Sequence, residues 1–240
     1  MRAAFFKGNT RHKDVSVVVL AKNEEKYIER CLKSIRNQTI ISELIVVDGN
    51  STDRTRAIAA KYADKVVSDK GKGMAHARNL GWKLAKGDIV AYFDADSRPT
   101  AEWVENIIKE MHDADAVSGP LSTYDGGLGL VIKFKVWADL VPRLLAAFHF
   151  NNLWGANMAF RKSALKREPF KANFLEDFEI GRRLQKIGKV KFTKNVRLSV
   201  SSRRFTGGFY RTCVRFYLPA AARIMLLKDY KQSGYYKSGD

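Results

Sequence analysis

Several features that define other protein classes are scarce in this sequence of 240 residues. It has two cysteines, Cys31 and Cys213, which are too few and too far apart for a zinc site or a secreted disulfide framework. Its 5 prolines and 17 glycines are too few for a fibrous repeat or a low-complexity chain. Because hydrophobic residues make up 45% and charged residues 28%, we expect a globular domain with a substantial core.

Long hydrophobic runs are also missing. No uncharged apolar run approaches the roughly 20 residues that a membrane-spanning helix needs. The segment 1–14 carries several charged side chains around a short apolar run, so it lacks the hydrophobic core of a signal peptide. We therefore expect a cytoplasmic protein, with peripheral attachment to the cytoplasmic face of a membrane as an open alternative.

Acidic side chains are few relative to basic ones, and the formal net charge is +18. Residues 1–120 carry 20 basic and 17 acidic side chains, whereas residues 121–240 carry 23 and 8. The excess therefore lies almost entirely in the second half. It indicates an anionic partner, for which nucleic acid, a membrane surface and a phosphorylated substrate all qualify.

Predicted strands and helices alternate along the first half. The strands cover 15–20, 43–47, 65–68 and 88–93, and the helices cover 24–37, 52–62 and 73–85. This alternation is typical of a parallel sheet with right-handed crossovers. Because ligands of such sheets bind beyond the carboxyl ends of the strands, we expect Asn23, Asp48 and Asp94 to converge there.

The pattern weakens after a further strand predicted over 115–118. The apolar stretch 128–150 predicts a helix, with Pro142 as a kink or a break. Beyond it, we expect 154–160 to return to the sheet, 177–188 to be helical and 191–202 to be extended. No linker separates two domains.

Acidic residues at two strand ends are candidates for nucleotide chemistry. Of Asp94 and Asp96, one could reach a ribose hydroxyl while the other holds Mg²⁺ or Mn²⁺, cations that prefer oxygen ligands and often share a site with substrate phosphates. A solvated turn is the alternative. Asp48 could accept the N3–H of a uracil ring or merely form a turn, and a charge in the first turn of a helix explains Asp53.

A glycine-rich segment precedes the third predicted helix. Glycines at this position allow close approach to phosphates, and Arg78, early in the helix, could meet a base or a diphosphate.

Together these blocks, in this order and spacing, resemble family-2 glycosyltransferases of the GT-A fold. The matching segments are Val17-Val-Val-Leu-Ala-Lys-Asn-Glu24, Val47-Asp-Gly-Asn-Ser-Thr-Asp-Arg54, Ala77-Arg-Asn-Leu-Gly81, Gly87-Asp88 and Phe93-Asp-Ala-Asp96. The resemblance covers about residues 14–205. It implies an α/β domain with a Rossmann-like, mostly parallel sheet flanked by helices, and it leaves 206–240 as a basic amphipathic helical extension.

The resemblance also implies a nucleotide-sugar donor, linked to UDP or GDP, and a divalent metal, Mg²⁺ or Mn²⁺. Asp94 would reach the ribose or the donor sugar, and Asp96 would bind the metal. In the family an aromatic residue or histidine usually follows the position of Ala21, whereas this chain has Lys22, so base stacking does not carry over. The positions that would line the nucleotide pocket are Ala21, Asn23, Glu24, Asp48 and Arg78.

A fourth block, Phe174-Leu-Glu-Asp-Phe-Glu-Ile-Gly-Arg-Arg-Leu-Gln-Lys-Ile-Gly188, resembles the segment that supplies the catalytic base of inverting members. Asp177 would take the proton of the acceptor hydroxyl, a role worth about 10² to 10⁴ in rate. The alternative is that the acids of this block are ordinary charges at a helix N-terminus.

Two further segments match the family more loosely. Arg204, with Arg203 as the alternate, falls where relatives carry an arginine beside the leaving diphosphate, although a surface arginine pair would look the same. Trp154 and Asn157 fall in the segment that lines the acceptor side, where we also place Glu176, and a buried strand is the alternative there.

The basic second half also suits a membrane. Residues 128–150 and 209–227 could both touch a membrane, and the second segment interleaves apolar and basic side chains as an interfacial helix does. A helix packed on the domain would show a similar apolar face. We therefore expect a saccharide or a lipid-linked acceptor and an anionic membrane surface as partners. The alternatives are a polyprenyl-phosphate glycosyltransferase, which would need no base, and a basic nucleic-acid-binding protein, for which no recognisable motif is present.

Overall fold

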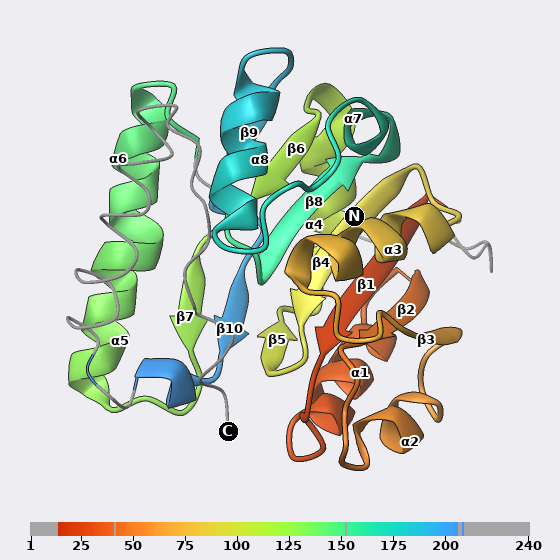
Figure 1. Ribbon diagram of the computed structural model, residues 1–240. Coiled ribbons are helices and arrows are strands. Elements are labelled where there is room, and N and C mark those ends of the chain that lie inside the picture. Colours follow the sequence, from red (N-terminus) through yellow and green to blue (C-terminus); the bar gives the residue numbers. More distant parts are fainter. Residues whose placement is uncertain (1–13, 41, 152, 206–207, 209–240) are drawn as a thin grey trace, which may run out of the picture.

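The computed structural model describes residues 14–40, 42–151, 153–205 and 208 (Figure 1). The basic extension expected over 206–240 therefore lies outside the described residues, apart from Gly208. Throughout the described ranges, helices and strands alternate around a central sheet, which confirms the predicted α/β fold.

Seven strands form the central sheet in the order β3-β2-β1-β4-β8-β6-β9. The first four are parallel, as predicted, whereas β8 runs antiparallel to both β4 and β6. β9 is parallel to β6. The strands are β1 (Val15–Ala21), β2 (Glu43–Asp48), β3 (Lys65–Ser68), β4 (Ile89–Asp94), β6 (Ala116–Ser118), β8 (Asn157–Arg161) and β9 (Val190–Phe192).

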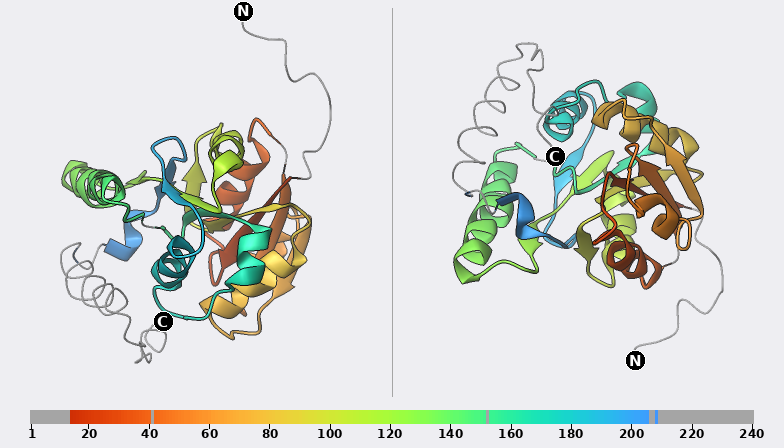
Figure 2. Two further views of the ribbon diagram at one scale, coloured as in Figure 1. Left: turned by 90° about the horizontal axis from the view of Figure 1, so that it is seen from above. Right: turned by 60° about the horizontal axis from the view of Figure 1, so that its bottom comes forward.

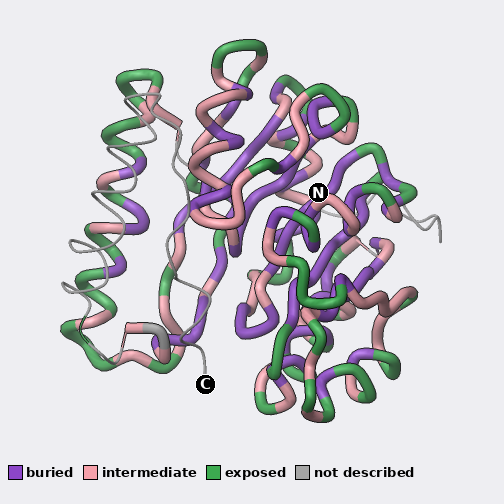
Figure 3. Tube along the Cα trace, in the orientation of Figure 1, coloured by how far each residue is buried: buried purple, intermediate pink, exposed green. Residues whose placement is uncertain are grey.

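Helices cover both faces of this sheet, and β1 is therefore buried on both of its sides. Val15, Val17 and Val19 point toward one face and pack with α1, α2 and α4, whereas Val18 and Leu20 point toward the other and pack with α3, α7 and α8. The helices are α1 (Ile28–Arg36), α2 (Thr55–Ala59), α3 (Met74–Leu84), α4 (Trp103–Glu110), α7 (Lys162–Arg167) and α8 (Glu176–Gln185). The buried strands therefore run through the middle of the molecule, between layers that are more exposed (Figure 3).

Two helices begin later than the sequence pattern predicted. α1 starts at Ile28 rather than at Glu24, and α2 starts at Thr55 rather than at Thr52. The residues before each helix form loops at the carboxyl edge of the sheet, where side chains of the second loop accept from backbone N–H groups of the first. This difference matters for function because these loops carry several of the predicted site residues.

A second, three-stranded sheet was not predicted from the sequence. Its order is β5-β10-β7, with β5 (Ser97–Pro99), β7 (Leu121–Thr123) and β10 (Leu198–Val200). β10 pairs antiparallel with β5 and parallel with β7. The extended segment predicted over 191–202 is thus divided between two sheets, and it ends in a short 3₁₀ helix, η3 (Ser202–Phe205). Another short 3₁₀ helix, η1 (Met111–Asp113), follows α4.

The long apolar stretch forms one rod that joins α5 (Leu128–Lys135), a π-helical turn η2 (Val136–Leu140) and α6 (Val141–Ala147). Pro142 lies in the first turn of α6 and does not break the rod. A proline ring crowds the preceding turn and lacks an N–H, and the wider π turn before it can absorb both effects. The rod lies at one side of the molecule, beside β7 and η3 and away from α1 to α3 (Figure 2).

Among the described residues, no helix combines the length and the apolar character needed to cross a bilayer.

One buried side chain connects the central sheet to a helix and to two loops. Asn157, at 0% exposure, donates from Nδ2 to the carbonyls of Gly119 (3.1 Å) and Val196 (2.9 Å) and accepts from Trp103 Nε1 (2.9 Å). It therefore joins β8 to α4 and to the loops that follow β6 and precede β10.

Replacing Asn157 with alanine should lower the free energy of unfolding by about 2 to 4 kcal/mol, because three buried polar groups lose their partner. Equilibrium unfolding in urea measures this. The control Asn106→Ala removes a surface hydrogen bond to the Asn195 carbonyl and should cost less than about 1 kcal/mol. Equal losses in the two variants would contradict the role we assign to Asn157.

Candidate active site

The register of the parallel strands gathers polar residues at one edge of the sheet. Ala21 pairs with Asp48, Leu20 pairs with Asp94, and Asp48 also pairs with Ser68 across the next strand. The strand ends therefore lie side by side at the carboxyl edge. This confirms the prediction that Asp48 and Asp94 converge there.

Asn23 joins the loops that follow β1 and β2. Its backbone has a φ of 54°, its N–H donates to Ser51 Oγ (2.9 Å), and its Oδ1 accepts from the N–H of Thr52 (2.9 Å). Next to it, the N–H of Glu24 donates to Thr55 Oγ1 (2.7 Å). Asn23 thus links the two loops at the rim of the site, and its side chain does not line the pocket.

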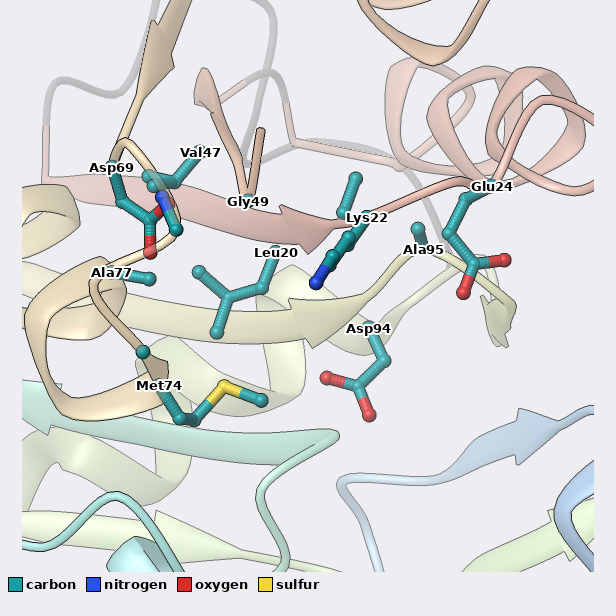
Figure 4. A pocket seen from close by; sticks show the side chains of 13 residues that line it. Leu20, Lys22, Glu24, Val47, Gly49, Asp69, Met74, Ala77, Asp94 and Ala95 are labelled. Carbon is teal, nitrogen blue, oxygen red and sulfur yellow. The ribbon is translucent and has the colours of Figure 1, made fainter. Parts of the chain in front are cut away.

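A pocket opens at this edge, and Figure 4 shows the side chains around it. Ala21, Glu24 and Asp94 line it, as the sequence predicted. Asp48 is not among the lining residues: it lies almost fully buried, with both carboxylate oxygens near the N–H of Ser51 (3.3 and 3.2 Å). The lining consists of Leu20, Ala21, Lys22, Glu24, Val47, Gly49, Asp69, Gly71, Gly73, Met74, Ala77, Asp94 and Ala95.

Lys22 and Asp69 are pocket residues that the sequence reasoning missed. The amine of Lys22 points into the space between Leu20 and Asp94, so it places a positive charge beside an acid (Figure 4). Asp69 directly follows β3, just as Asp48 ends β2, and this repeated position was the signal that could have identified it. Its carboxylate accepts from the N–H of Gly71 (2.7 Å) and shapes the glycine loop.

Gly73 shows why that loop needs glycine. Its φ is 102°, and a Cβ there would lie 2.8 Å from Asn173 Oδ1. That same oxygen accepts from the N–H of Ala75 (3.0 Å) in the first turn of α3. The segment before α8 therefore caps α3, and the loop between β3 and α3 passes close to it.

Arg78 is nearly buried and forms an ion pair with Glu176 across 98 residues of sequence. Its Nε and Nη2 both contact Glu176 Oε1, at 2.9 and 2.8 Å, and its guanidinium lies over the rings of Tyr92 and Phe170. Nη1 has no hydrogen-bond partner within the described part of the chain. Arg78 is not among the pocket-lining residues, and it connects α3 to the start of α8 instead.

The Asp177 carboxylate sits beside this pair. Its Oδ2 accepts from the N–H of Gly155 (2.7 Å) and its Oδ1 from the N–H of Phe178 (2.9 Å). Burial and the neighbouring Glu176 disfavour the ionised form, whereas Arg78 and the two N–H groups favour it. Burial and Glu176 prevail, and they raise the pKa of Asp177 to about 7.

Gly155 is packed between these groups. A Cβ at this position would lie 2.7 Å from Arg78 Nη2 and 3.2 Å from Asp177 Oδ2. Arg78 also interacts electrostatically with acids on both sides. Burial lowers the pKa of its guanidinium, but the carboxylates of Glu176, Asp94 and Asp177 outweigh that effect and raise the pKa. Asp94 of the pocket and the Glu176-Asp177 block therefore both lie within electrostatic range of Arg78.

Asp96 lies just beyond β4, almost fully buried, and its Oδ2 pairs with Nη2 of Arg203 at 3.0 Å. Arg203 also pairs with Glu24. The structure thus brings Arg203, the alternate in the sequence prediction, to an acidic cluster formed by Glu24 and Asp96. Arg204 also lies in η3, but its side chain falls outside the described part.

The acidic residues fit a divalent cation only if the substrate completes its coordination. Within the described residues, no three His, Cys, Asp or Glu side chains are grouped as a metal site. Asp94 and Asp96 do offer hard oxygen ligands beside the pocket. Mg²⁺ and Mn²⁺ commonly use one or two carboxylates together with substrate phosphates and water, which these two residues can satisfy.

Three residues were expected on the acceptor side. Glu176 is buried and paired with Arg78, and the other two differ from each other. Trp154 directly precedes Gly155, whose N–H bonds the Asp177 carboxylate, and its half-buried side chain packs against the core. The amide of Asn157, in contrast, is buried and engaged by Trp103, Gly119 and Val196 as described above. This contradicts the placement of Asn157 on the acceptor side and agrees with the alternative of a buried strand, because its polar atoms already have protein partners.

Comparison with known proteins agrees with this geometry. Residues 16–169 match the family model for glycosyl transferase family 2, and the chain therefore belongs to that family. It is 30% identical over 166 residues to glycosyltransferase GlyG of Streptococcus pneumoniae, an alignment that covers 65% of this chain and 55% of that protein. It is 31% identical over 125 residues to glycosyltransferase AglE of Haloferax volcanii, covering 47% and 41%. The chain thus spans about half the length of these relatives.

Solved structures share the fold. Staphylococcus aureus TarS in complex with UDP-GlcNAc superposes with a TM-score of 0.65 at 22% identity, covering 91% of this chain and 68% of that one. The mannosyltransferase PcManGT from Pyrobaculum calidifontis, in complex with GDP-Man and Mn²⁺, gives a TM-score of 0.66 at 21% identity, covering 90% and 65%. The described domain accordingly has the GT-A fold.

Proposed function

We propose that this chain transfers a sugar, with inversion, from a UDP- or GDP-linked donor to a hydroxyl group of a saccharide or lipid-linked acceptor. The observation that carries the proposal is the Asp177 carboxylate, which two backbone N–H groups hold and which lies next to Arg78 around Gly155. Family membership supports it, as do the fold neighbours that were solved with UDP-GlcNAc and GDP-Man.

The donor would occupy the pocket at the carboxyl edge of the sheet. Ala21 and Glu24 would line it, and Asp94 would accept from a ribose or sugar hydroxyl. Lys22 would add a positive charge toward the diphosphate, in place of the Tyr or His that usually occupies this position in the family. Asn23 and Asp48 would act by holding the rim loops.

Asp96, together with Asp94, would hold the Mg²⁺ or Mn²⁺ that accompanies the donor. When bound, this cation neutralises negative charge on the diphosphate. The chain adds its own positive charge through Arg203 and, as predicted from the sequence, Arg204. A guanidinium near the diphosphate stabilises the charge that grows as the glycosidic bond breaks.

Asp177 would act as the general base. The acceptor hydroxyl gives its proton to the carboxylate while its oxygen bonds to the anomeric carbon, and the nucleoside diphosphate leaves with the electrons of the broken bond. The Gly155 and Phe178 N–H groups fix the carboxylate, and Trp154 would contact an acceptor sugar. A base whose pKa lies near neutrality is well matched to this role.

Two alternatives predict different behaviour. A polyprenyl-phosphate acceptor is already ionised, so that enzyme would keep its activity without Asp177. A nucleic-acid-binding protein would show steeply salt-dependent affinity for DNA or RNA and no affinity for sugar nucleotides. Membership of a glycosyl transferase family favours the enzyme, and the geometry around Asp177 favours a hydroxyl acceptor.

The chain should bind UDP or GDP when Mn²⁺ or Mg²⁺ is present, as isothermal titration calorimetry can measure. Asp96→Asn should abolish the metal-dependent part of that binding, because the variant loses a carboxylate ligand. Asp88→Asn, at the opposite end of β4 and exposed, should bind like the wild type. Absence of diphosphate binding with either metal would refute the donor assignment.

Asp177→Asn should bind the donor normally but lose at least about 10²-fold in transfer rate. Because the base acts in its ionised form, the wild-type rate should rise with pH through about 7 and then level off, and the variant should lack this rise. Stopped assays of nucleoside-diphosphate release at several pH values measure both. Glu179→Gln, a carboxylate of the same helix that pairs with Arg183, is the control and should keep the profile. A normal rate in Asp177→Asn would remove this residue from the base role.

An anionic membrane surface is the further partner that we propose, and the α5–α6 rod would bind it. Nine large hydrophobic side chains are exposed in the described part of the chain, and eight of them lie on this rod. Leu128 and Phe148, at its two ends, are 77% and 82% exposed. Six residues repeat at every fourth position along the rod: Leu128, Ile132, Val136, Leu140, Leu144 and Phe148.

The charges of the rod favour lipid over a second copy of the chain. Lys133, Lys135 and Arg143 are exposed, and the single acid, Asp139, contacts Lys135 (2.6 Å) and Arg143 (2.7 Å). The rod therefore carries net positive charge beside an apolar stripe, as interfacial helices do. Two copies packed through this stripe would bring like charges together.

The full chain should bind vesicles of phosphatidylcholine with phosphatidylglycerol more tightly than vesicles of phosphatidylcholine alone, and less tightly at high salt. The double variant Ile132→Gln with Leu144→Gln should lose at least about tenfold in vesicle affinity, because two side chains of the stripe no longer insert. Ile187→Gln, the ninth exposed hydrophobic residue and the one outside the rod, is the matched control. Unchanged binding of the double variant would refute the proposal, and a dimer that the double variant abolishes would assign the stripe to a second copy.

A further inference from the structure

Arg203 meets two carboxylates that come from distant parts of the chain. Its Nη2 contacts both Glu24 and Asp96, and its Nε donates to Asp96 Oδ2 at 3.0 Å. Its guanidinium also lies 4.6 Å from the centre of the Tyr27 ring. Two anionic groups and an aromatic face thus surround one cationic group.

Backbone structure places Arg203 there. Val200 pairs with Ser97 in the small sheet, and the N–H of Ser201 donates to the carbonyl of Asp96 (3.2 Å). Asp125 then accepts from Ser201 Oγ (2.8 Å) and from the N–H of Ser202 (2.6 Å). The start of η3 is therefore fixed against the Asp96 loop, so the ion pair follows from the fold of the small sheet.

The oxygen that Arg203 binds belongs to the residue to which the proposed function assigns the metal. A guanidinium and a divalent cation cannot both take Asp96 Oδ2 at contact distance. In the substrate-free protein the guanidinium also compensates the repulsion between the nearby Glu24 and Asp96 carboxylates. A cation bound to the other oxygen, Oδ1, would still be repelled by the guanidinium on the same carboxylate, so the two cations compete for Asp96.

We propose that Arg203 is an internal counter-ion that holds the Asp96 carboxylate in the substrate-free protein and yields it to the divalent cation. This inference rests on the proposed function, because it takes Asp96 as the metal ligand. Arg203 is thus a positioning residue: it keeps the acidic cluster assembled and lowers its affinity for metal alone. A competitor that occupies the ligand reduces the apparent affinity in proportion to the fraction of molecules in which the ligand is left unoccupied.

The test is a titration of the full chain with Mn²⁺ in the absence of nucleotide, with free Mn²⁺ followed by electron paramagnetic resonance. Arg203→Gln removes the competing charge and should bind Mn²⁺ about tenfold more tightly than the wild type. Arg203→Lys keeps the positive charge without the planar fork and should lie between the two. The double variant with Asp96→Asn should lose the gain, because the gain requires that carboxylate.

Arg98→Gln is the matched control for a change in the general field. Arg98 lies in β5, two residues from Asp96, and stacks on the Tyr124 ring, with its guanidinium carbon 3.7 Å from the ring centre. Its loss should change Mn²⁺ affinity by less than about twofold. Thermal unfolding monitored by circular dichroism checks that each variant is folded, and Arg203→Lys keeps the test decisive where Arg203→Gln does not fold.

Equal or weaker Mn²⁺ binding by Arg203→Gln would overturn the proposal, as would an equal gain in Arg98→Gln. Failure of the wild type and of Arg203→Gln alike to bind Mn²⁺ would also overturn it. Because the probe is the metal alone, this result is independent of whether the chain binds UDP or GDP, which tests the proposed function separately.

Discussion

The parallel pairing of β1 with β2 and β4 is the constraint on which the rest of the site depends. Because Ala21 pairs with Asp48 and Leu20 with Asp94, three strands end at the same level and deliver their following loops to one edge. Those loops then bond to each other through Asn23. A shift of one residue in this register would turn the alternating valines of β1 away from their helical layers, so the packing of the core also fixes the alignment of the site.

Two arginines join this edge to parts of the chain that come much later in sequence. Arg78 reaches Glu176 on α8, and Arg203 reaches Glu24 and Asp96 from η3. In each case a buried or half-buried acid obtains its counter-charge from a distant element, and a carboxylate left alone there would be costly. The site is therefore held together by ion pairs that form only when the whole domain has folded.

The charge asymmetry of the chain gains a more specific meaning from these contacts. Part of the basic excess of the second half, such as Arg203, neutralises acids contributed by the first half. Another part lies on the α5–α6 rod beside exposed apolar side chains, with one acid on the same rod. The net charge of +18 thus includes basic residues that neutralise internal acids and basic residues that lie on the surface. Only the positions of these residues in the structure distinguish the two groups.

The sequence alone determined the alternating α/β pattern, the parallel strands through β4 and the convergence of Asp48 and Asp94, because these follow from hydrophobic periodicity and from the geometry of parallel sheets. It also located the Glu176-Asp177 block through its resemblance to a family. It missed the small sheet, whose strands have three residues each and are too short to show a period. Tertiary structure alone decided that Asn157 is buried and that Arg203 contacts Asp96. Those outcomes depend on contacts between residues far apart in the chain, and the identity of a residue does not specify which distant group the fold will bring to it.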